Sequence, residues 1–94
     1  MKPVIVICGH GPGISDSVAR KFGREGFAIA LVARSADRIA AAAAALEQEG
    51  ITAKGFAADL GDPAAVRAAL RDIRASLGPI TVLHWNAYSR VVSD

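Results

Sequence analysis

Residues 4–15 read Val-Ile-Val-Ile-Cys-Gly-His-Gly-Pro-Gly-Ile-Ser, and this stretch constrains the fold more than any other. Its first four residues are β-branched and form a continuous apolar run, as expected of a strand buried on both faces. Glycines follow at positions 9, 11 and 13, and an amphipathic helical pattern begins at Ile14. Glycine lets the backbone approach an anion closely, and the first N–H groups of a helix point toward it. The stretch therefore predicts a strand, a turn and a helix that together bind a phosphate group.

The rest of the chain alternates between apolar runs of strand length and helical patterns. After the first run, strands are expected over residues 27–33, 51–57 and 80–86, and helices over residues 14–24, 36–49 and 63–77. Ser35 and Asp62 are the expected N-caps of the second and third helices. The expected buried stripe of the third helix consists of Val66, Leu70, Ile73 and Leu77. Lys54 and Gly55 interrupt the third strand, which suits a position near the edge of the sheet.

Short strands that alternate with helices are typical of βαβ units and of a parallel sheet. Right-handed crossovers place the four strands in the order 3-2-1-4. The predicted fold class is therefore α/β, a Rossmann-like parallel sheet with three crossover helices. It is half of a doubly wound fold, and residues 1–94 form a single domain. Ligands of such sheets bind at the carboxyl ends of the strands, beside the point where the strand order reverses.

Composition narrows the classes of partner. The formal net charge is +2 and the basic residues are scattered, which gives little support to binding of nucleic acid or of a membrane surface. A single cysteine cannot form an internal disulfide, which fits a reducing compartment. The apolar run after Lys2 is too short for a signal peptide or a membrane span. We therefore expect a cytoplasmic protein.

The glycine turn lacks the third glycine of the general dinucleotide fingerprint, because Ile14 stands where G-x-G-x-x-G requires it. The spacing Gly9-x-x-x-Gly13-Ile14 instead resembles the short-chain dehydrogenase/reductase family, whose loop reads Thr-Gly-x-x-x-Gly-Ile-Gly. Cys8 replaces the threonine and Ser15 the last glycine, and both are small enough for the loop to form. The resemblance implies that the dinucleotide is bound at Gly9, Gly11, Gly13 and Ile14.

The end of the second strand carries the residues expected to select the cofactor. A fold specific for NAD usually has an acidic residue here, which binds the ribose 2′-hydroxyl. This chain has Arg34-Ser35 and no acid. A guanidinium pairs in bidentate fashion with a 2′-phosphate, and a serine hydroxyl can donate a further hydrogen bond. We therefore favour NADP(H) over NAD(H), the alternative being that Arg34 is a solvated residue at a strand end.

The segment after the third strand also resembles the family. Members have an aspartate here that hydrogen-bonds the adenine amino group and a neighbour that packs on the ring, and this chain has Asp59-Leu60. The alternative for Asp59 is a turn residue or an additional helix cap.

The end of the fourth strand is similar to the family motif Asn-Asn-Ala-Gly, since it reads Trp85-Asn86-Ala87-Tyr88. The resemblance implies that Asn86 braces the central sheet and that the backbone at Ala87 lies along the cofactor. Trp85 and Tyr88 depart from the motif, and the bulk of Tyr88 would crowd the cofactor's path.

Family members catalyse hydride transfer between NAD(P)H and a carbonyl or alcohol with a Tyr-x-x-x-Lys pair and an upstream serine. The one tyrosine of this chain is Tyr88, and Val92 stands four residues later. We therefore interpret the chain as the NADP(H)-binding segment of an oxidoreductase, without catalytic residues of its own and without turnover. The alternative is a non-catalytic nucleotide-binding or interaction module.

The remaining candidates have structural explanations. Cys8 is expected to be a small buried residue rather than a reactive thiol. His10 either touches a phosphate or faces solvent, and His84 is expected to pack or to hydrogen-bond, because metal ligands at suitable spacing are absent. The fourth strand would offer an apolar edge, so an isolated chain is expected to be marginally stable, to self-associate through that edge, or to be a fragment, which is the preferred explanation.

Overall fold

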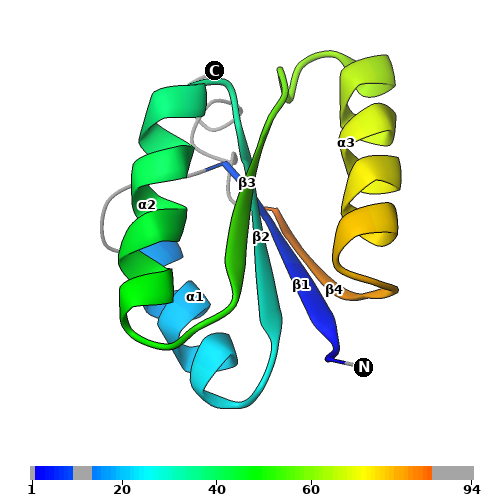
Figure 1. Ribbon diagram of the computed structural model, residues 1–94. Helices are drawn as coiled ribbons and strands as arrows, with labels where there is room; N and C mark the ends of the chain where they lie inside the picture. The colour runs from blue at the N-terminus through cyan, green and yellow to red at the C-terminus, as the bar shows by residue number, and fades with distance from the viewer. Residues whose placement is uncertain (1, 10–13, 86–94) are drawn as a thin grey trace.

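The computed structural model describes residues 2–9 and 14–85. Within them, four strands and three helices alternate along the chain (Figure 1). The strands are β1 (Val4–Cys8), β2 (Ala28–Ala33), β3 (Ala53–Ala57) and β4 (Ile80–Trp85). The helices are α1 (Ile14–Arg24), α2 (Ala36–Gln48) and α3 (Pro63–Ser76). All strand pairings are parallel and the order is β3-β2-β1-β4, which confirms the predicted Rossmann-like sheet.

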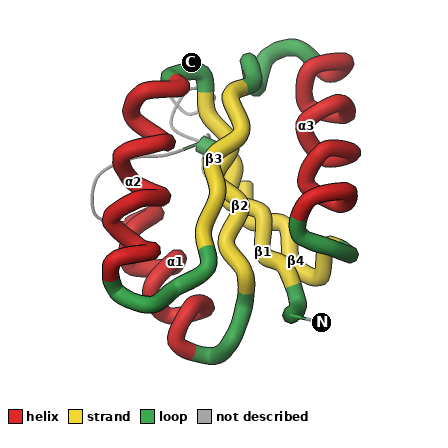
Figure 2. Tube along the Cα trace, viewed as in Figure 1, coloured by secondary structure: helices red, strands yellow, loops and turns green. Residues whose placement is uncertain are grey.

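The sheet has a helical layer on each face, with α1 and α2 on one side and α3 on the other (Figures 1 and 2). Successive residues of β1 point to opposite faces. Ile5 and Ile7 join the apolar core under α1 and α2, whereas Val4, Val6 and Cys8 join the core under α3. All five side chains are fully buried. The strand is therefore apolar without alternation because both of its faces are covered.

Local signals set where the helices begin. Asp62 Oδ1 accepts hydrogen bonds from the backbone N–H groups of Ala64 and Ala65, at 3.0 and 3.5 Å, and Pro63 occupies the first turn of α3. Ser35 Oγ accepts a bond of 3.4 Å from the N–H of Arg38, as expected of the α2 N-cap. Both predicted caps are confirmed.

Strands β2 and β3 begin one and two residues later than expected. The cause is the helix that precedes each strand. The N–H of Phe27 donates to Phe22 O in α1 at 3.0 Å, and the N–H of Ile51 donates to Leu46 O in α2 at 3.1 Å. These residues therefore close the helix ends before the chain enters the sheet.

The buried stripe of α3 differs from the expected one. Ile73 is fully buried as predicted, but Leu70 and Leu77 are only half-buried. Ala69, which was not part of the predicted stripe, is buried against the sheet, whereas Val66 is half-buried. A helix that packs closely on a sheet places a small side chain at the point of contact, and the larger residues lie at the sides of that contact.

Gly23 marks a close approach between the end of α1 and the start of the segment before β3. A Cβ atom at this position would lie 2.5 Å from Cγ2 of Ile51. Ile51 is itself buried in the core under α1 and α2. A side chain at position 23 is therefore excluded unless the isoleucine moves.

Strand β4 forms the edge of the sheet next to β1. Leu83 pairs with Val6 and Trp85 with Cys8, so both side chains lie on the face that α3 covers. They are nevertheless 52% and 46% exposed. The predicted apolar edge is therefore present on the fourth strand.

Candidate functional site

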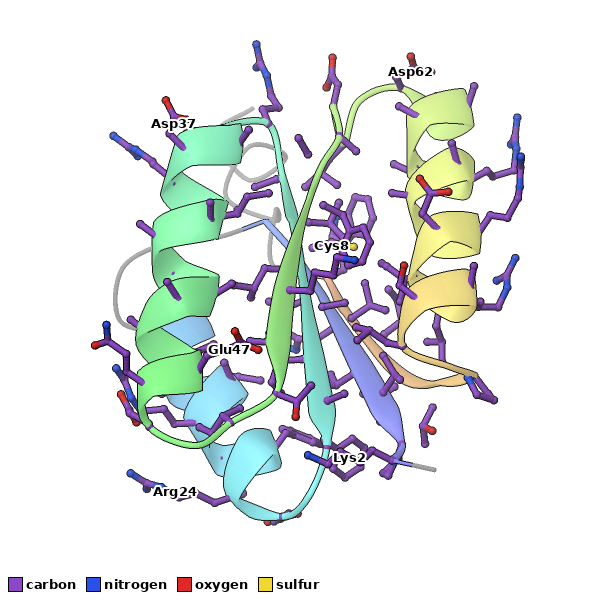
Figure 3. All side chains as sticks on the ribbon, viewed as in Figure 1. Lys2, Cys8, Arg24, Asp37, Glu47 and Asp62 are labelled. Atoms are coloured by element: carbon purple, nitrogen blue, oxygen red, sulfur yellow. The ribbon has the colours of Figure 1, made fainter. Side chains whose placement is uncertain are left out.

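The candidate residues gather at the carboxyl ends of the parallel strands. Cys8 is in register with Val32, and Ala33 with Ala57, so β1, β2 and β3 end at one edge of the sheet. Helices α2 and α3 begin at the same end of the molecule. In Figure 3, the labelled Asp37 and Asp62 mark this end of the molecule, and Lys2 and Arg24 lie at the opposite end.

Gly9 turns the chain out of the sheet at the end of β1. Its φ angle of 86° lies in the left-handed region that favours glycine. Its N–H donates a hydrogen bond of 2.8 Å to Val32 O in β2, which fixes the start of the turn to the neighbouring strand. Helix α1 begins at Ile14. The predicted strand and helix therefore flank the glycine turn, while Gly11 and Gly13 lie outside the described residues.

Arg34 and Ser35 connect β2 to α2, and both are exposed. Ser35 uses its hydroxyl oxygen and its carbonyl as acceptors, from the N–H groups of Arg38 and Ile39 respectively. The hydroxyl proton is therefore still available to donate to a ligand. Among residues 2–9 and 14–85, no carboxylate forms an ion pair with the guanidinium of Arg34.

Asp59 shapes the turn between β3 and α3. Its Oδ1 accepts a hydrogen bond of 2.9 Å from the N–H of Gly61, and its carbonyl accepts one of 3.0 Å from the N–H of Asp62. The turn role that we considered as the alternative is thus present. The carboxylate is exposed and still has acceptor capacity, because one oxygen takes part in the turn and the other has no partner among the described residues.

A backbone bond brings this segment next to the end of β2. The N–H of Ala58 donates to Ala33 O at 2.9 Å, so Asp59 is the residue directly after the point where the two strand ends meet. Leu60 is half-buried and packs on the core under α3. The structure therefore brings Arg34 and Asp59 to adjacent strand ends.

Cys8 is a buried structural residue. Its side chain is fully buried, and this burial raises the pKa of the thiol from 9.0 to about 11. The thiol is therefore protonated near neutral pH, where only a thiolate would be an effective nucleophile. The prediction of a small buried residue is confirmed.

His84 lies on β4 in register with Ile7, on the face covered by α1 and α2. The residue is half-buried, as packing predicts. Its Nε2 atom is buried and has no hydrogen-bond partner among residues 2–9 and 14–85. The hydrogen bond that we considered for it is therefore not found in that part of the chain.

The remaining candidate residues and features add little to the description of the site. Asn86 and Ala87, together with His10 and Tyr88, lie outside the described residues. Within the described ranges, no group of three or more histidine, cysteine, aspartate or glutamate side chains could hold a metal ion. A surface hollow of about 400 Å³ lies along α1, and its lining residues include none of the candidates. The described helices are all too short or too polar to cross a bilayer.

Comparison with known proteins identifies relatives over most of the chain. A family model described as short chain dehydrogenase matches residues 3–92. The chain is 37% identical over 84 residues to 2-(S)-hydroxypropyl-CoM dehydrogenase 3 of Xanthobacter autotrophicus, an alignment that covers 89% of this chain and 33% of that protein.

Solved structures agree with the family match. The L-sorbose reductase of Gluconobacter frateurii, solved with NADPH and L-sorbose, is 36% identical with a TM-score of 0.79, over 87% of this chain and 32% of that one. A variant of actinorhodin polyketide ketoreductase, solved with NADPH, is 27% identical with a TM-score of 0.85, over 92% and 33% of the two chains. The chain thus spans about a third of the length of these relatives.

Proposed function

The chain belongs to the short-chain dehydrogenase family, and we propose that it is the NADP(H)-binding segment, a single domain, of an oxidoreductase of that family. Bound nicotinamide dinucleotides in similar structures support a dinucleotide cofactor. The full-length reaction that we propose is hydride transfer between NADPH and a carbonyl or an alcohol. A cytoplasmic location is part of the proposal and rests on the single cysteine.

The observation that carries the proposal is the pair Arg34-Ser35 at the carboxyl end of β2. An acidic residue at this position would bind a ribose 2′-hydroxyl, whereas a guanidinium is suited to a 2′-phosphate. The exposed Arg34 side chain and the free hydroxyl proton of Ser35 are both compatible with a phosphate ligand. This combination favours NADP(H) over NAD(H).

The other described residues would hold the rest of the cofactor. The left-handed turn at Gly9 and the start of α1 are suited to the pyrophosphate, because helix N–H groups and glycine backbone favour anions. Asp59 has acceptor capacity to receive a hydrogen bond from an adenine amino group, and Leu60 offers apolar surface next to it. The cofactor would supply the hydride chemistry, while this segment binds and orients the adenosine end.

The test is a titration of the 94-residue chain with NADPH, with NADH and S-adenosylmethionine as controls. The proposal expects NADPH to bind with the lowest dissociation constant and S-adenosylmethionine not to bind. Equal affinity for NADPH and NADH would refute the role of Arg34-Ser35. Absence of binding to any of the three would leave an interaction module as the better interpretation.

Catalysis by the chain itself is not part of the proposal. The one tyrosine, Tyr88, is followed four residues later by Val92 and not by a lysine, so these 94 residues contain no Tyr-x-x-x-Lys pair. We expect no oxidation of NADPH with any carbonyl substrate, and steady turnover in a spectrophotometric assay would contradict this expectation.

We also propose self-association through β4 as a second candidate function. The exposed Leu83 and Trp85 lie on an edge strand, and unpaired strand edges recruit further strands. Sedimentation velocity over a wide concentration range tests this candidate. Leu83→Lys should reduce association, whereas Ala44→Lys, on the exposed side of α2, should not change it. A protein that stays monomeric at all concentrations would exclude it.

A further inference from the structure

Helix α3 carries three arginines, Arg67, Arg71 and Arg74, at exposed positions. Successive residues of a helix are rotated by about 100°, so these three positions fall within about 60° of one another. Ala69 is the residue of α3 that is buried against the sheet. The three arginine positions are rotated from it by about 140–160°. They therefore form a stripe on the side of the helix that points away from the sheet, which we call the arginine stripe.

The arginine stripe contributes little to the stability of the helix that carries it. Like charges three and four residues apart on a helix repel each other. Among residues 2–9 and 14–85, none of the three side chains forms an ion pair or a hydrogen bond. Asp72, the acidic residue within α3, is rotated from the arginines by about 100–160° and lies on another side of the helix. Only Arg74, in the last turn, interacts favourably with the helix dipole.

The surface around the arginine stripe is open to a large partner. In Figure 1, no other described helix lies on the face of the sheet that α3 covers, and the outer side of α3 points away from all described elements. The exposed positions beside the stripe are Ala64, Ala68 and Ala75. The distance at which two helices pack depends on the side chains between them, so these small residues allow a second helix to approach closely.

The residues of this surface favour a protein partner over a nucleic acid or a membrane. The exposed positions of α3 include no aromatic side chain on which a base could stack and no large apolar side chain that could enter a bilayer. Guanidinium groups pair in bidentate fashion with carboxylates, and arginine is enriched at protein interfaces. The stripe extends over about 10 Å, or two helical turns. Carboxylates at positions i, i+4 and i+7 of a second helix repeat the spacing of the three arginines.

We propose that the arginine stripe of α3 is a docking surface for a helix of a partner protein that presents carboxylates at positions i, i+4 and i+7. Each carboxylate pairs with one guanidinium, and the alanines beside the stripe form the contact between the two helices. The candidate cofactor site lies elsewhere, at the carboxyl ends of the strands. The inference therefore does not depend on the proposed binding of NADP(H).

The probe for this surface is a fluorescein-labelled helical peptide with glutamates at positions i, i+4 and i+7, and the control peptide has glutamines there. Fluorescence anisotropy measures the binding of each peptide to the 94-residue chain. The glutamate peptide should bind about tenfold more tightly, as expected from several exposed ion pairs. Arg67→Gln combined with Arg71→Gln should remove most of this preference. Lys21→Gln combined with Arg24→Gln removes the same charge from exposed positions of α1 and should preserve it.

The outcomes distinguish specific docking from general attraction between charges. Equal binding of the two peptides, or no binding of the glutamate peptide, would overturn the inference. Equal weakening by the two double variants would also overturn it. A single-stranded oligonucleotide or a phosphatidylserine vesicle that binds more tightly than the glutamate peptide, and only with the arginines present, would assign the stripe to that ligand instead.

Thermal unfolding of the variant with Arg67→Gln and Arg71→Gln separates docking from a structural role. Its thermal midpoint should not fall, because the substitutions relieve the repulsion between like charges on one side of the helix. A lowered midpoint would show that the arginines stabilise α3 and would contradict the inference.

Discussion

The buried thiol of Cys8 makes the stability of the fold depend on alkaline pH. Below pH 9.0 the thiol is protonated in the folded and in the unfolded chain, so it contributes no pH dependence. Between pH 9.0 and about 11 the unfolded chain releases this proton while burial keeps it on the folded chain. The unfolded state then binds fewer protons, and the free energy of unfolding falls as the pH rises.

The magnitude follows from the two pKa values. One pKa unit corresponds to about 1.4 kcal/mol. The shift from 9.0 to about 11 therefore lowers the free energy of unfolding by about 1.3 kcal/mol between pH 8 and pH 10. Urea unfolding of the unmodified chain and of Cys8→Ala at these two pH values measures the effect. All other residues are the same in the two proteins, so the difference between them isolates the thiol. A difference that stays constant from pH 8 to pH 10 would refute the argument.

Two further predictions concern packing and capping. Gly23→Ala should lower the free energy of unfolding by about 1–3 kcal/mol, because the new Cβ would lie 2.5 Å from Ile51 Cγ2. Urea unfolding measures this loss. A double variant with Ile51→Ala whose loss of stability equals the sum of the two single losses would contradict the clash. Asp62→Ala should lower the free energy of unfolding by about 1 kcal/mol, because it removes the N-cap hydrogen bonds of α3. Asp62→Asn should retain most of the stability. Equal losses for the two variants in thermal unfolding would exclude capping as the cause.

Those parts of the fold that depend on local signals could be predicted from the sequence. The apolar run of β1 predicted a strand that is covered on both faces, and an apolar core lies on each face of the sheet. Ser35 and Asp62 act as N-caps because their role needs only the next few backbone N–H groups. The strand order followed from the handedness of crossovers, which is independent of side-chain detail.

Contacts between distant elements were harder to predict. The burial of Ala69 in place of larger neighbours depends on how closely α3 approaches the sheet, which periodicity alone does not specify. For Asp59, a turn and a ligand contact use the same residue type, so only the bond to Gly61 shows that one oxygen is engaged.

The measurement that tests the account most directly is the pair of dissociation constants for NADPH and NADH, determined for the unmodified chain and for Arg34→Asp. The account predicts tighter binding of NADPH by the unmodified chain and a reversed preference in the variant, because the carboxylate repels a 2′-phosphate and accepts a hydrogen bond from a 2′-hydroxyl. A cofactor preference that is the same in both proteins would contradict the assignment of this strand end as the NADP(H)-selecting site.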